Sequence, residues 1–190
     1  PISPSFEPES ELEGQWSVCS PETAHNISAV SYFFAQKLVE RLDKPVGVII
    51  SAWGGSTVQA WISKNSRQSD LLKTILPYDV TGHYLNMRPG FLFNGMISPL
   101  IPYSFKGVLW YQGESNTMDQ FNPHLYRYLF KGMIKDWRNV WDHQKMPFYF
   151  VQLPNLHGGK DWPILRESQE IVYEELTNVE MATTIDIGES

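Results

Sequence analysis

Residues 107–116 read GVLWYQGESN, an apolar run that gives way to hydrogen-bonding side chains at a glycine. The apolar part predicts a buried strand over 106–111. In open α/β sheets, ligands bind beyond the carboxyl ends of the strands. We therefore expect the polar side chains of residues 112–116 to lie at such a site.

A second apolar run has the same organisation. Residues 46–51 read VGVIIS and lead into AWGGST at residues 52–57. The run predicts a buried parallel strand, and Gly54 and Gly55 free the backbone to turn and to present its N–H groups. Two strand ends are thus expected to point at one cleft.

Helical periodicity alternates with these strands along the chain. The expected elements are helices over 28–42, 122–137 and 163–176, a short helical turn over 59–62, a helix over 69–76, and strands over 148–153 and 181–187. This alternation predicts one α/β domain with a doubly wound parallel sheet and helices on both faces. Residues 1–25, rich in Pro, Glu and Ser, are expected to form an irregular lead-in, and residues 63–90 an irregular, cleft-forming insertion.

Composition narrows the function classes. The net charge is −6 and the sequence pI is near 5.3, so no basic surface for nucleic acid is expected. No 18-residue apolar stretch or charged-then-apolar leader occurs, so the sequence predicts neither a membrane span nor a signal peptide. Cys19 is the single cysteine. With no zinc-ligand, phosphate-loop or dinucleotide motif, we expect no metal and no cofactor.

The residues alone leave the chemistry of the loop at 112–116 open. Its carboxamides suit an oxyanion-binding loop, and they equally suit a hydrogen-bonded turn. Ser115 follows Gly113 and Glu114 as in half of a nucleophile elbow, but Thr117 stands where the elbow needs glycine, so we do not expect a nucleophile there. Ser56 is similarly expected to satisfy backbone groups. None of the five histidines stands out as a base.

Three blocks of sequence resemble the sialate O-acetylesterase group of the SGNH-hydrolase superfamily. They are ISAWGGS at 50–56, LFNGMISPL at 92–100 and GVLWYQGESN at 107–116. The resemblance extends from about Trp16 to Gly188. It implies a flavodoxin-like three-layer fold and a serine esterase that removes acetyl groups from sialic acids or from plant polysaccharides such as acetylated xylan. The implied mechanism is acyl transfer by a serine and a histidine.

The resemblance also implies roles for individual residues. Oxyanion contacts would come from the backbone N–H of Gly55 and from the carboxamide of Gln112 or Asn116, with Glu114 as a support for the loop. The residues expected near the substrate are Trp53, Tyr111 and His157. An O-acetylated carbohydrate is the expected partner, and the resemblance suggests a secreted, periplasmic or lysosomal setting.

Two motifs of that group do not occur in these 190 residues. The group carries its nucleophile in a Gly-Gln-Ser-Asn type motif after the first strand, and its base in an Asp-x-x-His motif beyond a segment like 186–188. We therefore expect a partial esterase domain that lacks its first strand and its C-terminal end and is inactive by itself. A bared parallel edge would favour a homo-oligomer.

Two other functions stay open at this point. A noncatalytic carbohydrate-binding module on the same fold would keep the cleft without the chemistry. A lipase-like or peptidase-like SGNH hydrolase would need a broad apolar channel, and the polar loop at 112–116 argues weakly against it.

Overall fold

The computed structural model describes residues 3–66, 70–76, 85–156 and 159–187 of the chain. Two compact units are present: Glu13–Ala52 form the smaller, while Pro1–Leu12 and Trp53–Ser190 form the larger. The organisation of the chain as a single domain stays a prediction. None of the described helices combines the length and apolar character that a membrane crossing requires.

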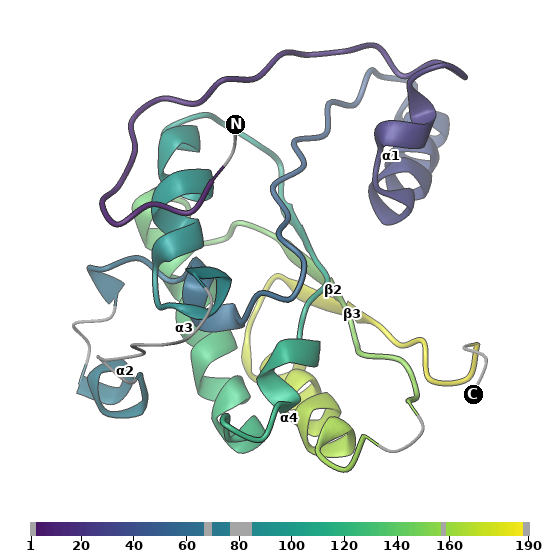
Figure 1. Cartoon of the computed structure of the whole chain (residues 1–190). Helices are drawn as coiled ribbons and strands as arrows, with labels where there is room; N and C mark the ends of the chain where they lie inside the picture. Colours follow the sequence, from purple (N-terminus) through teal and green to yellow (C-terminus); the bar gives the residue numbers. More distant parts are fainter. Residues whose placement is uncertain (1–2, 67–69, 77–84, 157–158, 188–190) are drawn as a thin grey trace. The chain divides into compact units, whose positions relative to one another are not determined.

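The larger unit is built on a parallel sheet of three strands in the order β1-β2-β3, of which Figure 1 labels β2 and β3. The strands are β1 (Val108–Trp110), β2 (Phe148–Val151) and β3 (Val179–Ala182). In the register, Phe148 pairs with Val108 on one side and with Val179 on the other. Three predicted strands are thus confirmed, although the last runs over 179–182 and not over 181–187.

Helices α3 (Tyr126–Val140) and α4 (Trp162–Glu175) connect these strands and pack against each other. Both confirm predicted helices. The chain enters α3 through the short helix η8 (Pro123–Leu125), where Asn122 Oδ1 accepts a hydrogen bond from the His124 backbone N–H at 3.0 Å. A proline and an Asn cap are a common helix start, which explains this boundary.

One face of the sheet packs against α3. Phe148 and Phe150 are buried on that face and contact rings of the helix. Tyr149 points to the opposite face and is 40% exposed. The structure therefore shows helices on one face, and helices on both faces stay a prediction.

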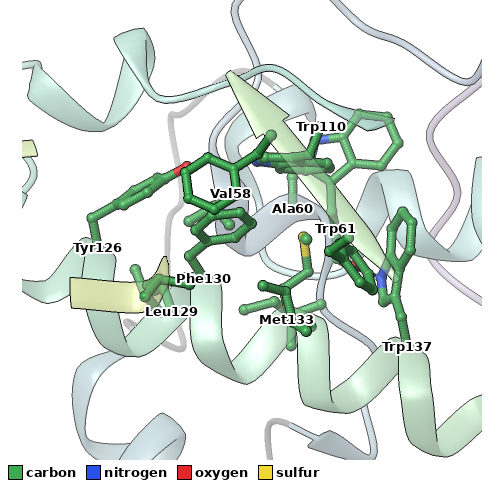
Figure 2. Packing of buried hydrophobic residues seen from close by; sticks show 14 of the residues in the cluster. Val58, Ala60, Trp61, Trp110, Tyr126, Leu129, Phe130, Met133 and Trp137 are labelled. Atoms are coloured by element: carbon green, nitrogen blue, oxygen red, sulfur yellow. Dashed lines mark hydrogen bonds between the residues drawn. The ribbon is translucent and has the colours of Figure 1, made fainter. Parts of the chain in front are cut away.

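An aromatic cluster fills the space between the sheet and α3 (Figure 2). The Trp110 ring lies 5.9 Å from that of Phe130, 6.1 Å from that of Trp137 and 6.0 Å from that of Trp61. The two Trp–Trp contacts are edge-to-face, a geometry that adds to the free energy of apolar burial. Because Trp110 ends β1 and Trp61 ends a short helix, the cluster anchors the chain next to residues 112–116 and residues 52–57.

Short helices account for much of the remaining chain. In the larger unit they include η2 (Val58–Trp61), η4 (Leu85–Met87), η5 (Phe93–Ile97), η6 (Ser98–Leu100) and η7 (Glu114–Thr117). The first confirms the helical turn predicted near 59–62, and α2 (Asp70–Ile75) confirms the helix predicted over 69–76. The cleft-forming role of residues 63–90 stays a prediction, and residues 67–69 and 77–84 lie outside the described residues.

The lead-in is irregular, as predicted, but its first part is docked within the larger unit. The Ser5 N–H donates to the Phe91 carbonyl and the Glu9 N–H to the Asn94 carbonyl, both at 3.0 Å. A Cβ on Gly95 would lie 1.8 Å from the Ser3 carbonyl oxygen. This segment therefore fits closely because residue 95 has no side chain.

The smaller unit contains η1 (Ala24–Asn26) and α1 (Ala29–Leu42), which confirms the first predicted helix. Asp43 ends α1 in the left-handed conformation, with φ of 50°. The prediction of a strand over 46–51 is wrong. These residues form no strand, and Ile49 and Ile50 are exposed. The described strands pair only with one another, in the order β1-β2-β3, so the backbone of 46–51 has no strand partner among the described residues.

Candidate active site

The two loops predicted to meet are joined by three buried hydrogen bonds, all within the larger unit. Gln112 Nε2 donates to the Ser56 carbonyl at 3.0 Å, and the Val58 N–H donates to Asn116 Oδ1 at 2.9 Å. Asn116 Nδ2 donates to Gln59 Oε1 at 2.9 Å. The side chains of one loop therefore hold the backbone of the other.

Gly113 explains why the second loop turns where it does. Its φ is +155°, and a Cβ on it would lie 2.7 Å from Leu165 Cδ2 and 3.1 Å from Leu153 Cδ1. Only glycine lets the backbone pass this close to the core. Helix η7 begins directly afterwards, with the Asn116 N–H donating to the Gly113 carbonyl at 2.9 Å.

The first loop turns at Gly55, whose φ of +68° lies in the left-handed region. Asn86 holds the loop on both sides of this turn: its Nδ2 donates to the Gly54 carbonyl at 3.1 Å, and its carbonyl accepts from the Thr57 N–H at 3.3 Å. Gly55 is exposed, and its own N–H has no partner among the described residues. It is therefore available to a ligand.

The Gln112 carboxamide is fully engaged. Its two N–H groups donate to the Ser56 carbonyl and, at 2.8 Å, to Asn116 Oδ1, while its Oε1 accepts from the Tyr126 hydroxyl at 3.1 Å. Burial raises the pKa of the Tyr126 phenol far above its ordinary value, so this hydroxyl stays a neutral donor. A primary amide has two N–H groups, so Gln112 has none left for a ligand.

Asn116 has one donor left. Its Oδ1 accepts hydrogen bonds from Val58 and Gln112, and one N–H of its Nδ2 donates to Gln59. The second N–H has no partner among the described residues. Of the two carboxamides considered as oxyanion donors, the geometry favours Asn116, with Gln112 as the residue that holds it in position.

The serines of these loops are not paired with a histidine in the described chain. Ser56 Oγ accepts a hydrogen bond from the Trp61 indole at 3.0 Å. Ser115 is buried, and its hydroxyl has no hydrogen-bond partner among the described residues. A serine becomes a strong nucleophile only beside a base, so this geometry does not activate either hydroxyl.

The other predicted site residues lie on the exposed side of these loops. The Glu114 side chain is exposed and makes no hydrogen bond among the described residues. Its backbone carbonyl accepts from Thr117 Oγ1 at 2.7 Å. Tyr111 is 49% exposed, and Trp53 is 38% exposed. His157 lies outside the described residues. Burial, and then the negative charge of Glu114, raise the pKa of the Tyr111 phenol.

Sequence reasoning missed Gln59 and Tyr126. Gln59 lies between Val58 and Ala60, both fully buried, so a polar residue inside an apolar run was the available signal. Tyr126 gave no such signal, because its hydroxyl reaches the loop only through the packing of α3. Among the residues that the structure describes, no group of three or more His, Cys, Asp or Glu side chains could hold a metal ion.

Comparisons with known proteins identify the family. A family model for the carbohydrate esterases called sialic acid-specific acetylesterases matches residues 16–190. The sialate O-acetylesterase of Homo sapiens is 33% identical over 208 residues, which cover 96% of this chain and 39% of that protein. That of Mus musculus is 30% identical over 198 residues, which cover 83% of this chain and 36% of that protein.

A solved structure extends the agreement to the fold. The crystal structure of a carbohydrate acetylesterase from Xanthomonas citri matches with a TM-score of 0.86 and 37% sequence identity, over 100% of this chain and 42% of that chain. The chain thus spans about two fifths of the length of these relatives. By the family match and by these relatives, the chain belongs to the sialic acid-specific acetylesterase family of carbohydrate esterases.

Proposed function

We propose that the protein containing these residues is a carbohydrate O-acetylesterase, and that the chain supplies the oxyanion side of its active site. The observation that carries the proposal is the orientation of Asn116: the Val58 N–H fixes its Oδ1, which leaves an unused N–H on Nδ2. The N–H of Gly55, in the loop held by Gln112 and Asn116, also has no partner in the part of the chain that the structure describes. Donors that are held in place before the reaction are what an oxyanion needs.

The proposed reaction is acyl transfer. A serine Oγ attacks the acetyl carbonyl carbon and passes its proton to a histidine, while Gly55 and Asn116 donate to the oxyanion. The tetrahedral intermediate collapses, the bond to the sugar oxygen breaks, and the histidine protonates that oxygen. Water then attacks the acetyl-serine, and acetate leaves. We place the serine and the histidine outside these 190 residues, because neither motif that would carry them is in the sequence.

The proposed substrate is an acetyl ester on a carbohydrate such as a sialic acid or xylan. The family supports this class, and the exposed rings of Trp53 and Tyr111 beside the loops suit a sugar ring. We also propose that the sheet has helices on both faces in the folded protein. Leu109 and Val151 share the face of Tyr149, and parallel sheets with apolar residues on a face are normally covered there.

Acetate release tests the function. The substrates are an aryl acetate and an O-acetylated sialic acid, and the samples are the longest natural protein that carries these residues and the 190-residue chain alone. We expect activity in the longer protein alone. Activity in the 190-residue chain would mean that a serine within it, Ser115 or Ser56, is the nucleophile. Glycan binding without acetate release in both samples would favour the noncatalytic carbohydrate-binding module.

A further inference from the structure

Gln59 is a buried amide that reaches the site from η2. The whole residue is 3% exposed, and its backbone carbonyl accepts hydrogen bonds from the Ile62 N–H at 3.3 Å and the Gly90 N–H at 3.0 Å. Its Oε1 accepts from Asn116 Nδ2 at 2.9 Å. These contacts hold the side chain in one place. They involve its backbone carbonyl and its Oε1, but not its amide nitrogen.

Backbone groups at two points fix the direction of the amides. The Val58 N–H can only donate, so the atom of Asn116 that faces it is the oxygen. The Ser56 carbonyl can only accept, so the atom of Gln112 that faces it is the nitrogen. The nitrogen of Asn116 therefore faces Gln59, and the atom of Gln59 that accepts from it is the oxygen. The nitrogen of Gln59 is therefore the last donor in this series of hydrogen bonds.

That nitrogen has no hydrogen-bond partner among the described residues. The fully buried side-chain atoms without a partner, in the part of the chain that the structure describes, are Arg88 Nε, Asn94 Oδ1 and Trp110 Nε1. Gln59 Nε2 is not one of them, and its residue is almost wholly buried. Neither of its N–H groups is used by a described residue, so we infer that both can donate to a ligand.

All the donations run the same way. The Tyr126 hydroxyl donates to Gln112, Gln112 to Asn116, and Asn116 to Gln59. Each donation to an amide oxygen draws electrons from its nitrogen, and chains of this kind strengthen one another in a low-dielectric interior. Gln59 Nε2 is consequently a better donor than an isolated amide would be.

The free donors of Gln59 and Asn116 lie close enough to share one acceptor. The 2.9 Å bond between them and the width of an amide group place the two nitrogens within roughly 5 Å of each other. Two donors at this separation can each reach one oxygen at ordinary hydrogen-bond length.

We propose that Gln59 Nε2 donates, together with Asn116, to the acetyl carbonyl oxygen of the substrate as that oxygen becomes negative. This inference rests on the proposed function and adds a catalytic residue to it. Gln59 makes its acetyl contact through an atom that has no hydrogen bond to the described residues. Loss of that donor should therefore slow the reaction without breaking a described hydrogen bond of the fold.

The test replaces Gln59 by Glu in the longest natural protein that carries these residues. The change keeps an oxygen for Asn116 and removes the donor. We expect kcat for acetate release to fall about 100-fold or more, with KM little changed. The thermal midpoint should also fall, because the change buries a carboxylate at a site that is 3% exposed. The matched control is Gln144→Glu, because Gln144 is exposed and bonds only Asn139. Gln59→Met, of similar volume, serves as the second variant if the first does not fold.

Two esters separate the possible contacts. Donation to the acetyl oxygen predicts the same fold-loss with an aryl acetate and with an O-acetylated sialic acid. A loss confined to the sugar ester would overturn the assignment in favour of a contact to a sugar hydroxyl. An unchanged kcat in an active protein would overturn the role of Gln59 alone. If the unaltered protein releases acetate from neither ester, the proposed function fails and the role of Gln59 fails with it.

Discussion

The Val58 backbone N–H donates to the Asn116 side chain at 2.9 Å, across 58 residues of sequence. This bond does two things at once. It joins the loop after β1 to the segment after Gly55. It also fixes the orientation of the Asn116 amide, with Oδ1 toward Val58 and Nδ2 toward Gln59. We expect activity to depend on that orientation, and the stability of the larger unit to depend on the packing around the two loops.

Asn116→Asp should abolish the donors while it keeps the loops joined. One oxygen of the new carboxylate still accepts from Val58, but the other replaces Nδ2, so the Gln59 amide must rotate to donate to it. We expect kcat for acetate release to fall at least about 100-fold. Asn139→Asp is the matched control, since Asn139 is exposed on α3 and should leave the rate unchanged. Equal rates in both variants would remove Asn116 from the mechanism.

Gln112→Ala should lower activity and stability together. The change leaves the Ser56 carbonyl without its Gln112 side-chain partner, and an unpaired buried polar group costs about 1–3 kcal/mol. The Tyr126 hydroxyl loses Oε1 but keeps the backbone carbonyl of residue 112, to which it also donates at 3.2 Å. Asn116 loses its support at the same time, so we expect a fall in kcat of about 100-fold. Urea unfolding and acetate release measure the two effects. A variant with lower activity but native stability would mean that Gln112 contacts the substrate directly.

Gly113→Ala should destabilise the larger unit without any change in polar contacts. A Cβ would lie 2.7 Å from Leu165 Cδ2, and overpacking of this kind costs roughly 1–3 kcal/mol in free energy of unfolding. The φ of +155° adds a backbone cost for any residue with a side chain. Gly54→Ala is the control, because a Cβ there has no atom within 4 Å. If the two variants have equal urea midpoints, the backbone at residue 113 can move aside.

The sequence predicted the elements whose signals are local. Helix α3 follows from an Asn-Pro start and a strong apolar stripe, and β2 follows from a short apolar run before Gln152. It also predicted that the polar residues after β1 would meet the Gly54-Gly55 loop. These successes share a cause, since caps, periodicity and strand ends are properties of neighbouring residues.

What the sequence could not predict depends on distant partners. The need for glycine at 113 is set by Leu165, and the free nitrogen of Gln59 is set by a bond to Asn116. The apolar run at 46–51 had the composition of a strand, but a strand forms only beside another strand, and composition does not show whether one is there.

Ser63→Ala should destabilise the larger unit through the buried carboxylate of Asp136. Ser63 Oγ and the Ser63 N–H each donate to Asp136 at 2.7 Å. A hydrogen bond to a charged group contributes about 1.5–3 kcal/mol, and water cannot easily replace it at this buried site. Ser5→Ala is the control: its hydroxyl donates to the Glu9 carboxylate, also at 2.7 Å, but on the surface. We expect the control to change the free energy of unfolding by less than about 0.5 kcal/mol. Similar losses in both variants would mean that the buried bond gives no extra stability.

Tyr111 should titrate above its ordinary pKa of 10.0, and part of that shift should disappear in Glu114→Gln. Burial is the larger cause of the raised pKa and the Glu114 charge is the smaller, so the variant should lower the Tyr111 pKa without restoring the ordinary value. Because the folded pKa lies above the unfolded one, the unfolded chain ionises first as pH rises. Folding stability from Tyr111 is therefore complete below pH 10 and declines as pH rises through the folded pKa. Ultraviolet titration of the protein against Tyr111→Phe isolates this phenol, and Glu170→Gln on α4 serves as the control for loss of a charge. If Glu114→Gln leaves the Tyr111 titration where it was, the carboxylate and the phenol are too far apart, in solution, to interact.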